Sequence, residues 1–120
     1  DMKKIKIIDS LDLIRDDIKA SFEENYINVV NSHENKMLFI GAVNQYFKSL
    51  QSQGVLYDGA DCKAYIDVQS QREWLAQKYD VSDWTDSEIE VANTGSIIFA
   101  GADITIQDCI EDLSFKIGLE

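Results

Sequence analysis

The sequence contains no proline, one histidine and two cysteines, and each shortage narrows what the chain can be. Proline breaks helices and sheet ladders, so its absence fits a chain built mainly of regular elements. The lone histidine, His33, argues against multi-histidine metal sites and histidine-based triads, and we interpret it as a solvated or capping side chain. Cys62 and Cys109 form no CxxC pair, so we interpret both as free, small core residues.

Long apolar runs and basic residues are also scarce. No stretch approaches the roughly 20 apolar residues that cross a bilayer, and no signal-peptide layout opens the chain. The 22 acidic residues outnumber the 11 basic ones and give a net charge of −11. Phosphate-rich partners need clustered Lys and Arg, so this balance predicts neither a nucleic-acid nor an anionic-membrane partner. An acidic surface of this kind keeps a domain in solution or faces a basic protein.

The remaining motifs supply no catalytic constellation. Asp80, Asp83, Asp86 and Glu88 lie close together in "DVSDWTDSE", but the EF-hand spacing and its glycine are missing. We interpret them as a solvated acidic loop, with a weak cation site as the alternative. The glycine-containing strings lack the spacing and the lysine of a phosphate-binding loop. The sequence therefore predicts no enzyme: no catalytic residue, metal site, cofactor or small-molecule substrate.

What the sequence does contain is the material for one globular domain. Its 120 residues are 45% hydrophobic, and a chain of this length buries about two thirds of its unfolded surface. We predict a single domain over residues 1–120. Because the first residue is Asp1 rather than Met, we expect a fragment of a longer chain or a processed one.

A first amphipathic helix is predicted after a short strand or extended lead-in over residues 3–9. Asp9 or Ser10 is expected to cap it. Its apolar residues recur at helical spacing, which marks one buried face. The residues assigned to the core are Leu11, Ile14, Ile18 and Phe22.

A second, longer helix is predicted over residues 34–53. Asn31 or Ser32 is expected to cap its start, and Gly54 to end it. Its apolar face is broad, and the residues assigned to the core are Ile40, Val43, Phe47 and Leu50.

The second half of the chain alternates strand and helix patterns. After a turn at Asp58-Gly59, the patterns predict a strand over 63–68 and a shorter helix within 69–81 with Trp74 and Leu75 inward. Extended residues are predicted over 88–91, and two short strands around Gly101-Ala102. The predicted fold class is α+β, an α/β sandwich. A small, mainly antiparallel sheet has two longer helices and one shorter helix packed on it.

The last ten residues, "EDLSFKIGLE", read as a strand at or near a sheet edge. Apolar residues alternate with polar residues or glycine, so one face is buried. The strand over 113–120 pairs either within its own sheet or, as an inter-subunit arm, with a neighbouring chain. The residues of this candidate inter-subunit strand are Leu113, Phe115, Ile117 and Leu119.

Several short strings, in order, resemble one family. They are "IDSLDLIRDDI", "FEENYI", the "NK" that opens a long helix ending in "YFKSLQSQGVL", "ANTGS" at 92–96 and "DCIED" at 108–112. Together they are similar to the C-terminal domain of contractile phage tail sheath proteins, from a phage, a prophage or a phage-tail-like particle. The chain departs from the family pattern at Asn28 and Val29, and at Cys109, where a small alanine is usual.

The resemblance implies a structural virion protein. Sheath subunits polymerise around the tail tube, are linked by strands that neighbours add to one another's sheets, and contract during delivery of DNA or of the particle. The implied partners are other sheath subunits and the tail tube protein. The implied location is the virion, after assembly in the host bacterial cytoplasm. The outer faces of the first two helices offer four candidate tube-facing charges: Arg15, Lys19, Lys36 and Lys48.

A function of another class stays open beside this one. An acidic α/β module of this size could bind a basic protein partner without belonging to a polymer. A preceding sequence of several hundred residues in the same reading frame would favour the sheath interpretation, because sheath proteins are much longer than 120 residues.

Overall fold

A computed structural model describes residues 2–26, 32–108 and 110–120, with side chains from Ile7 onward. The domain measures 46 × 29 × 23 Å along its principal axes. Its elements in chain order are α1 (Met2–Asn25), α2 (His33–Ser52), β1 (Lys63–Ile66), α3 (Val68–Ala76), α4 (Asp86–Val91), β2 (Ile98–Ile106) and β3 (Glu111–Leu119).

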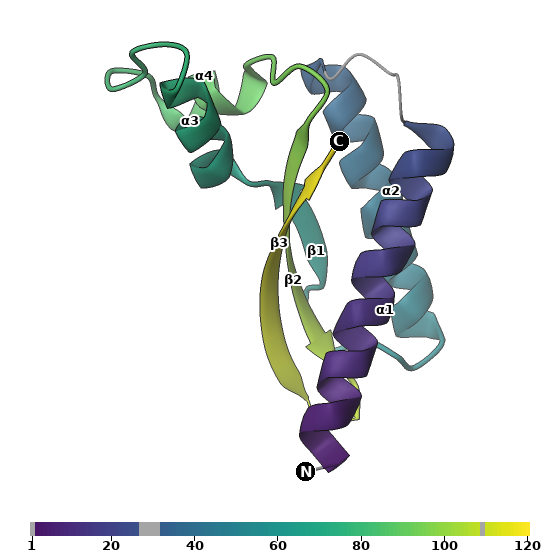
Figure 1. Cartoon of the computed structure of the whole chain (residues 1–120). Coiled ribbons are helices and arrows are strands. Elements are labelled where there is room, and N and C mark those ends of the chain that lie inside the picture. The colour runs from purple at the N-terminus through teal and green to yellow at the C-terminus, as the bar shows by residue number, and fades with distance from the viewer. Residues whose placement is uncertain (1, 27–31, 109) are drawn as a thin grey trace.

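The helices and the sheet form layers (Figure 1). The helices α1 and α2 lie side by side over one face of a small sheet, while α3 and α4 stand off its other side. Within the part of the chain that the structure describes, the sheet has three strands in the order β1-β2-β3, and both pairings are antiparallel. The predicted α+β class is confirmed.

The helix α1 begins much earlier than predicted, so the expected strand or lead-in over residues 3–9 is wrong. The apolar stripe that contains Leu11, Ile14 and Ile18 continues back to Ile7, which is partly buried. Because that spacing is helical throughout, the chain has no reason to become extended before it. Asp9 and Ser10 therefore lie inside the helix and do not cap it.

The helix α2 lies within one residue of its predicted bounds. The side chain of Ser32 accepts a hydrogen bond from the backbone N–H of Asn35 at 3.3 Å and caps the first turn. At the other end, Gly54 adopts a φ of +78°, a left-handed conformation that glycine enters without strain. The alternative cap, Asn31, lies outside the described residues.

The strand β2 is continuous, so the two short strands predicted around Gly101 are wrong. The ring of Tyr65 on β1 lies against Gly101, and a Cβ there would meet the Tyr65 ring at 2.8 Å. The glycine thus makes room for a cross-strand ring without ending the strand. The strand β1 also ends earlier than predicted, because the side chain of Asp67 caps α3 and places Val68 in that helix.

The segment predicted to be extended over residues 88–91 belongs to α4. Thr85 and Glu88 form a capping box: each side chain accepts a hydrogen bond from the other residue's backbone N–H, at 3.2 Å in both cases. The helices α3 and α4 bury a small apolar cluster of their own around Leu75, Val81 and Ile89.

The main core lies between the helix pair and the sheet. Leu11 packs at its margin, and the other seven residues assigned to the core from the sequence are buried in it. Phe39 is fully buried, and its ring meets those of Phe22 and Tyr26 edge-on, with centroids 5.7 and 5.0 Å away. Such aromatic pairs fix the entry of α2 against the end of α1.

Lys36 joins the small cluster to the main body. The side chain is fully buried, and its ammonium donates to the side-chain oxygen of Gln71 at 3.2 Å and to the carbonyl of Ala92 at 3.1 Å. Gln71 in turn donates to the carbonyl of Ile89 at 2.5 Å. The expectation that Lys36 lies on the outer face of α2 is therefore wrong, because it points into the joint between α2, α3 and α4.

Replacing Phe39 with alanine tests the aromatic core. We expect Phe39→Ala to lower the free energy of unfolding by about 3–5 kcal/mol, because it removes a fully buried ring and leaves a cavity. Leu38→Ala is the matched control: Leu38 is 65% exposed, so its truncation should change stability by less than about 0.5 kcal/mol. Urea unfolding measures both, and equal losses would contradict the assigned core.

The buried Lys36 predicts a rise in stability with pH. Burial lowers the pKa of Lys36 from 10.5 to about 8, so between these values the unfolded chain binds more protons than the folded domain. Stability should therefore increase as pH rises from about 8 towards 10.5, whereas below about 8 this group should cause no change of stability with pH. Burial and, to a lesser extent, a neighbouring carboxylate raise the pKa values of Tyr46 and Tyr65. These two groups lower the stability as pH rises above about 10, which is the opposite of the effect of Lys36.

Urea unfolding between pH 7.5 and 9.5 measures this slope apart from the tyrosines. Lys36→Met keeps an apolar stem and removes the titrating group, so its unfolding free energy should not show the rise. The same slope in Lys36→Met and in the unmodified chain would contradict the assignment.

Candidate assembly surface

The strand β3 pairs with β2 along one side, and within the described residues no strand pairs with its other side. The hydrogen bonds of β2 show which groups of β3 face that open edge. The N–H of Asp67 donates to the carbonyl of Phe99, and the N–H of Tyr57 donates to that of Thr105, both at 2.8 Å. The odd-numbered residues of β2 thus direct their backbone groups towards β1.

Antiparallel ladders alternate, so the even-numbered residues of β2 bond to β3. They pair with the odd-numbered residues of β3, such as Ala102 with Phe115. The even-numbered residues of β3 therefore direct their N–H and C=O groups away from the sheet. These four residues, which we call the open edge, are Asp112, Ser114, Lys116 and Gly118.

The candidate inter-subunit residues occupy the inner face of the same strand. Phe115 and Leu119 are buried in the main core, and Leu113 and Ile117 are partly buried against it. Their side chains therefore anchor β3 to its own domain. What β3 can offer to another chain is the backbone of the open edge, together with the outer face of the sheet.

Polar contacts fasten the outer face across the strands. Asp103 on β2 accepts a hydrogen bond from the Ser114 hydroxyl at 2.7 Å and from the Tyr65 hydroxyl at 3.2 Å. The Thr105 hydroxyl donates to Asp112 at 2.6 Å. These contacts hold β3 against β2 without using any backbone group of the open edge.

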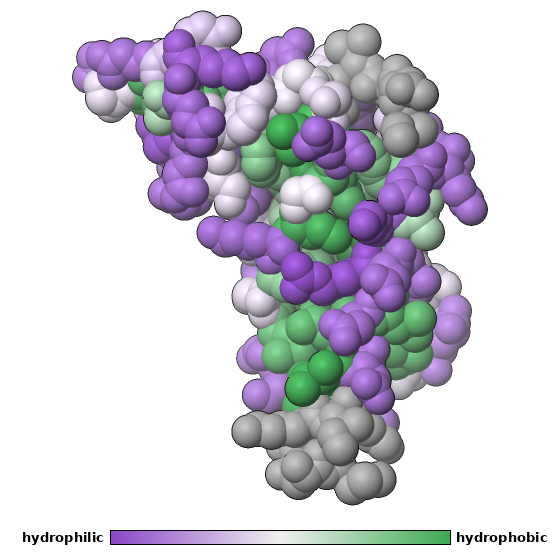
Figure 2. Space-filling view, viewed as in Figure 1, coloured by the Kyte–Doolittle hydropathy of each residue, from purple (hydrophilic) through white to green (hydrophobic). Residues whose placement is uncertain are grey.

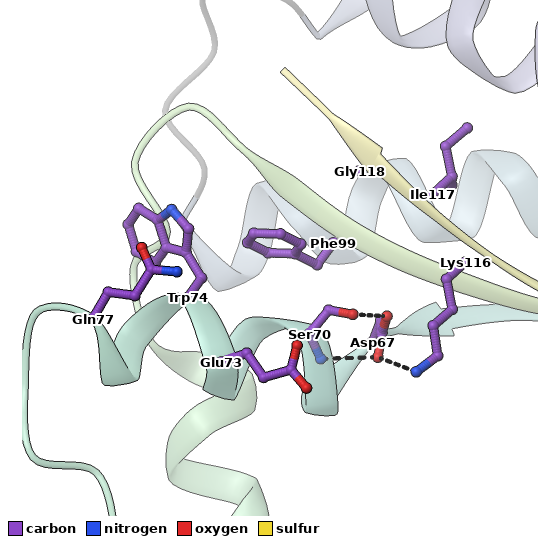
Figure 3. Close-up of a pocket in the computed structure, with 9 residues that line it drawn as sticks. All are labelled: Asp67, Ser70, Glu73, Trp74, Gln77, Phe99, Lys116, Ile117 and Gly118. Carbon is purple, nitrogen blue, oxygen red and sulfur yellow. Dashed lines mark hydrogen bonds and ion pairs between the residues drawn. The ribbon is translucent and has the colours of Figure 1, made fainter.

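A groove of about 390 Å³ lies beside the open edge, between α3 and the outer face of the sheet. Figure 3 shows the Trp74 and Phe99 rings on one side and the polar side chains of Asp67, Ser70 and Lys116 on the other. Asp67 accepts from the Ser70 N–H at 3.2 Å and hydroxyl at 2.5 Å, and lies 3.7 Å from the Lys116 ammonium. Gly118 pairs directly with Phe99 but carries no side chain to cover its ring.

Arg15 reaches from α1 to the open edge. Its guanidinium donates to the carbonyl of Lys116 at 3.1 Å and lies 5.5 Å from the centroid of the Phe115 ring. Figure 2 shows apolar residues along the seam between α1 and β3, with strongly hydrophilic residues crossing it. Of the other candidate tube-facing charges, Lys19 and Lys48 are exposed, whereas Lys36 is buried.

The acidic segment is held by local contacts. Asp80 accepts from the hydroxyl and the N–H of Ser82, and these bonds lower the pKa of its carboxyl. Asp86 pairs with Arg72 at 2.9 Å, and Glu88 completes the capping box. Among the described residues, no three potential metal ligands gather at one place.

Other candidate positions carry no evident chemistry. His33 is the first residue of α2, next to the Ser32 cap, and Cys62 is a partly buried free thiol. Cys109 lies outside the described residues. None of the helices that the structure describes has the length and apolar character of a membrane span.

Comparison with known proteins identifies the class. The family model for the phage tail sheath C-terminal domain matches residues 1–120, so the chain belongs to this family and is a structural protein domain. A curated relative, the tail sheath protein of Clostridium phage phiCD119, is 36% identical over 117 residues. That alignment covers 96% of this chain and 32% of the relative, so the chain spans about a third of the relative's length. A free-standing acidic binding module gains no support from either match.

Sequence reasoning missed both the groove and the contact of Arg15 with the open edge. The partners Arg15 and Lys116 are 101 positions apart, and no local pattern joins residues at that separation. One signal was available: a glycine inside a strand pattern, as at Gly118, often marks a site where another backbone or a ligand approaches closely.

Proposed function

We propose that this chain is one domain of a longer tail sheath subunit, which polymerises around the tail tube and contracts during delivery of DNA or of the particle. Neighbouring subunits are linked by strand addition at the open edge of β3, and the assembled protein is part of the virion. The observation that carries the proposal is the open edge itself. A nine-residue strand that is anchored to its own core directs the backbone of four residues outward, and within the described residues no strand pairs with them.

The physics of strand addition fits this edge. Main-chain hydrogen bonds give such a joint its cohesion, and alternate side chains set its register. Each bond contributes about 0.5–1.5 kcal/mol net, so several in a row hold two subunits together. A long strand edge without a partner is a liability for a free monomer, and a polymer that covers it removes that liability.

The outer face supplies a place for side chains of the added strand. Such a strand would direct every second side chain to the same face as Lys116 and Gly118. Beside Gly118, that side chain would enter the groove and cover the exposed part of Phe99. An apolar or aromatic residue suits this position, because it packs across a glycine against aromatic rings.

The contact with the tube involves charges on the outer faces of the helix pair. Lys19 on α1 and Lys48 on α2 are exposed and are our candidates for it. Lys36 is buried and Arg15 contacts β3, so neither is a candidate for the tube contact. The tube protein would then carry matching acidic groups.

Ser114→Pro in the full-length subunit tests strand addition. The Ser114 N–H faces the open edge, so proline removes a donor for an added strand without breaking a bond to β2. We expect polymerisation, followed by light scattering and electron microscopy, to be lost or strongly reduced.

Ser114→Ala is the matched control, since it loses the Asp103 contact but keeps the backbone N–H. It should polymerise like the unmodified subunit, and circular dichroism should show that both variants fold. Normal polymers from folded Ser114→Pro would contradict strand addition at this edge.

Charge reversal tests the contact with the tube. Lys19→Glu combined with Lys48→Glu should leave the domain folded, because both side chains are exposed and such charges contribute little to stability. Assembly of the sheath on the tube should weaken, and more so at low ionic strength. Tails of normal number and length, counted in electron micrographs, would show that these lysines do not face the tube.

A further inference from the structure

We propose that Arg15 guards the open edge, holding it closed in the unassembled subunit and leaving it when a neighbour's strand arrives. This inference rests on the proposed function, because it concerns the regulation of the same edge. It assigns Arg15 a role that differs from a contact with the tube.

The contact occupies a backbone group that an added strand would need. The carbonyl of Lys116 faces away from β2, as the ladder of β2 requires, and the Arg15 guanidinium donates to it at 3.1 Å. A strand added to β3 would place its own N–H about 2.9 Å from that oxygen, in a chain about 4.8 Å away. The Arg15 side chain lies in that space, so it competes with the strand.

The position of Arg15 is set by packing. It projects from α1, whose neighbours Ile14 and Ile18 are buried in the main core. Its guanidinium lies 5.5 Å from the Phe115 ring centre, within the range of a cation–π contact. Arg15 thus contacts two successive residues of β3, the ring of Phe115 and the carbonyl of Lys116.

The side chain of Lys116 does not cover the open edge. It turns across the outer face towards Asp67, 3.7 Å away, so it does not shield its own backbone. Charged side chains are a common means of protecting sheet edges from unwanted pairing. Here the protecting charge comes from a helix on the inner face, and it can withdraw without any change in the sheet.

Arg15→Met in the full-length subunit tests this role. Methionine keeps an apolar stem against Phe115 and removes the competing donors. Without tube protein, the variant should polymerise at a concentration about threefold to tenfold lower than the unmodified subunit, since one charge-assisted hydrogen bond no longer opposes strand addition. Lys63→Met is the matched control. It removes one exposed positive charge from β1, at the far edge of the sheet, and should not change the polymerisation threshold.

The double variant Arg15→Met with Ser114→Pro separates this inference from the proposed function. If Arg15→Met lowers the polymerisation threshold by acting at the open edge, the double variant polymerises no better than Ser114→Pro alone. If Ser114→Pro abolishes polymers but Arg15→Met leaves the threshold unchanged or raises it, strand addition stands and the guard is wrong. If Ser114→Pro polymerises normally, strand addition at this edge fails, and a gain from Arg15→Met that survives in the double variant overturns the guard as well.

Discussion

The hydrogen-bond ladder of β2 is the constraint on which the surface of this domain depends. The odd-numbered residues of β2 bond to β1 and the even-numbered ones to β3, so the pattern of unpaired groups on β3 is fixed. The same alternation sends the apolar side chains of β3 inward. The apolar side chains of β3 are therefore packed in its own core, while the backbone groups of its even-numbered residues face outward. That combination makes the edge stable enough to persist and open enough to pair.

A second constraint positions the groove. Lys36 ties α2 to Gln71 on α3 and to Ala92 after α4, which holds the small helical unit against the main body. With α3 in that place, Trp74 lies 6.3 Å from Phe99, ring centre to ring centre, and forms one wall of the groove. A buried polar contact on one side of the domain therefore shapes a surface on the other. An ammonium group is costly to bury, and it is tolerated here because it donates hydrogen bonds to two acceptors.

Periodicity predicted the parts of the fold that repeat. The stripe of Ile14, Ile18 and Phe22, the face of α2 and the alternation in β3 all follow from side-chain spacing, which burial enforces. Two of the errors, at the end of β1 and the start of α4, occurred where a local polar contact decides. Asp67 ended β1 early and the capping box of Thr85 and Glu88 started α4, and these side chains override weak extended patterns.

The candidate surface was less accessible from the sequence. A lysine within an amphipathic helix usually faces water, and only the tertiary fold shows that two acceptors from other elements lie within reach of Lys36. The terminal strand was recognised, but its open edge depends on which neighbour it has. Which backbone groups stay open is decided by the pairing of β3 with β2 and not by the sequence of β3 alone.

The length and direction of β3 also determine how a joint on this edge would carry force. If a neighbour's strand were pulled along its own axis, the hydrogen bonds of the joint would be loaded in shear, all at once. A pull at right angles to the strands would open them one after another, like a zipper, at a much lower force. A joint on this edge is therefore strong along one direction and weak along another, and the orientation of the sheet relative to a moving neighbour decides which strength applies.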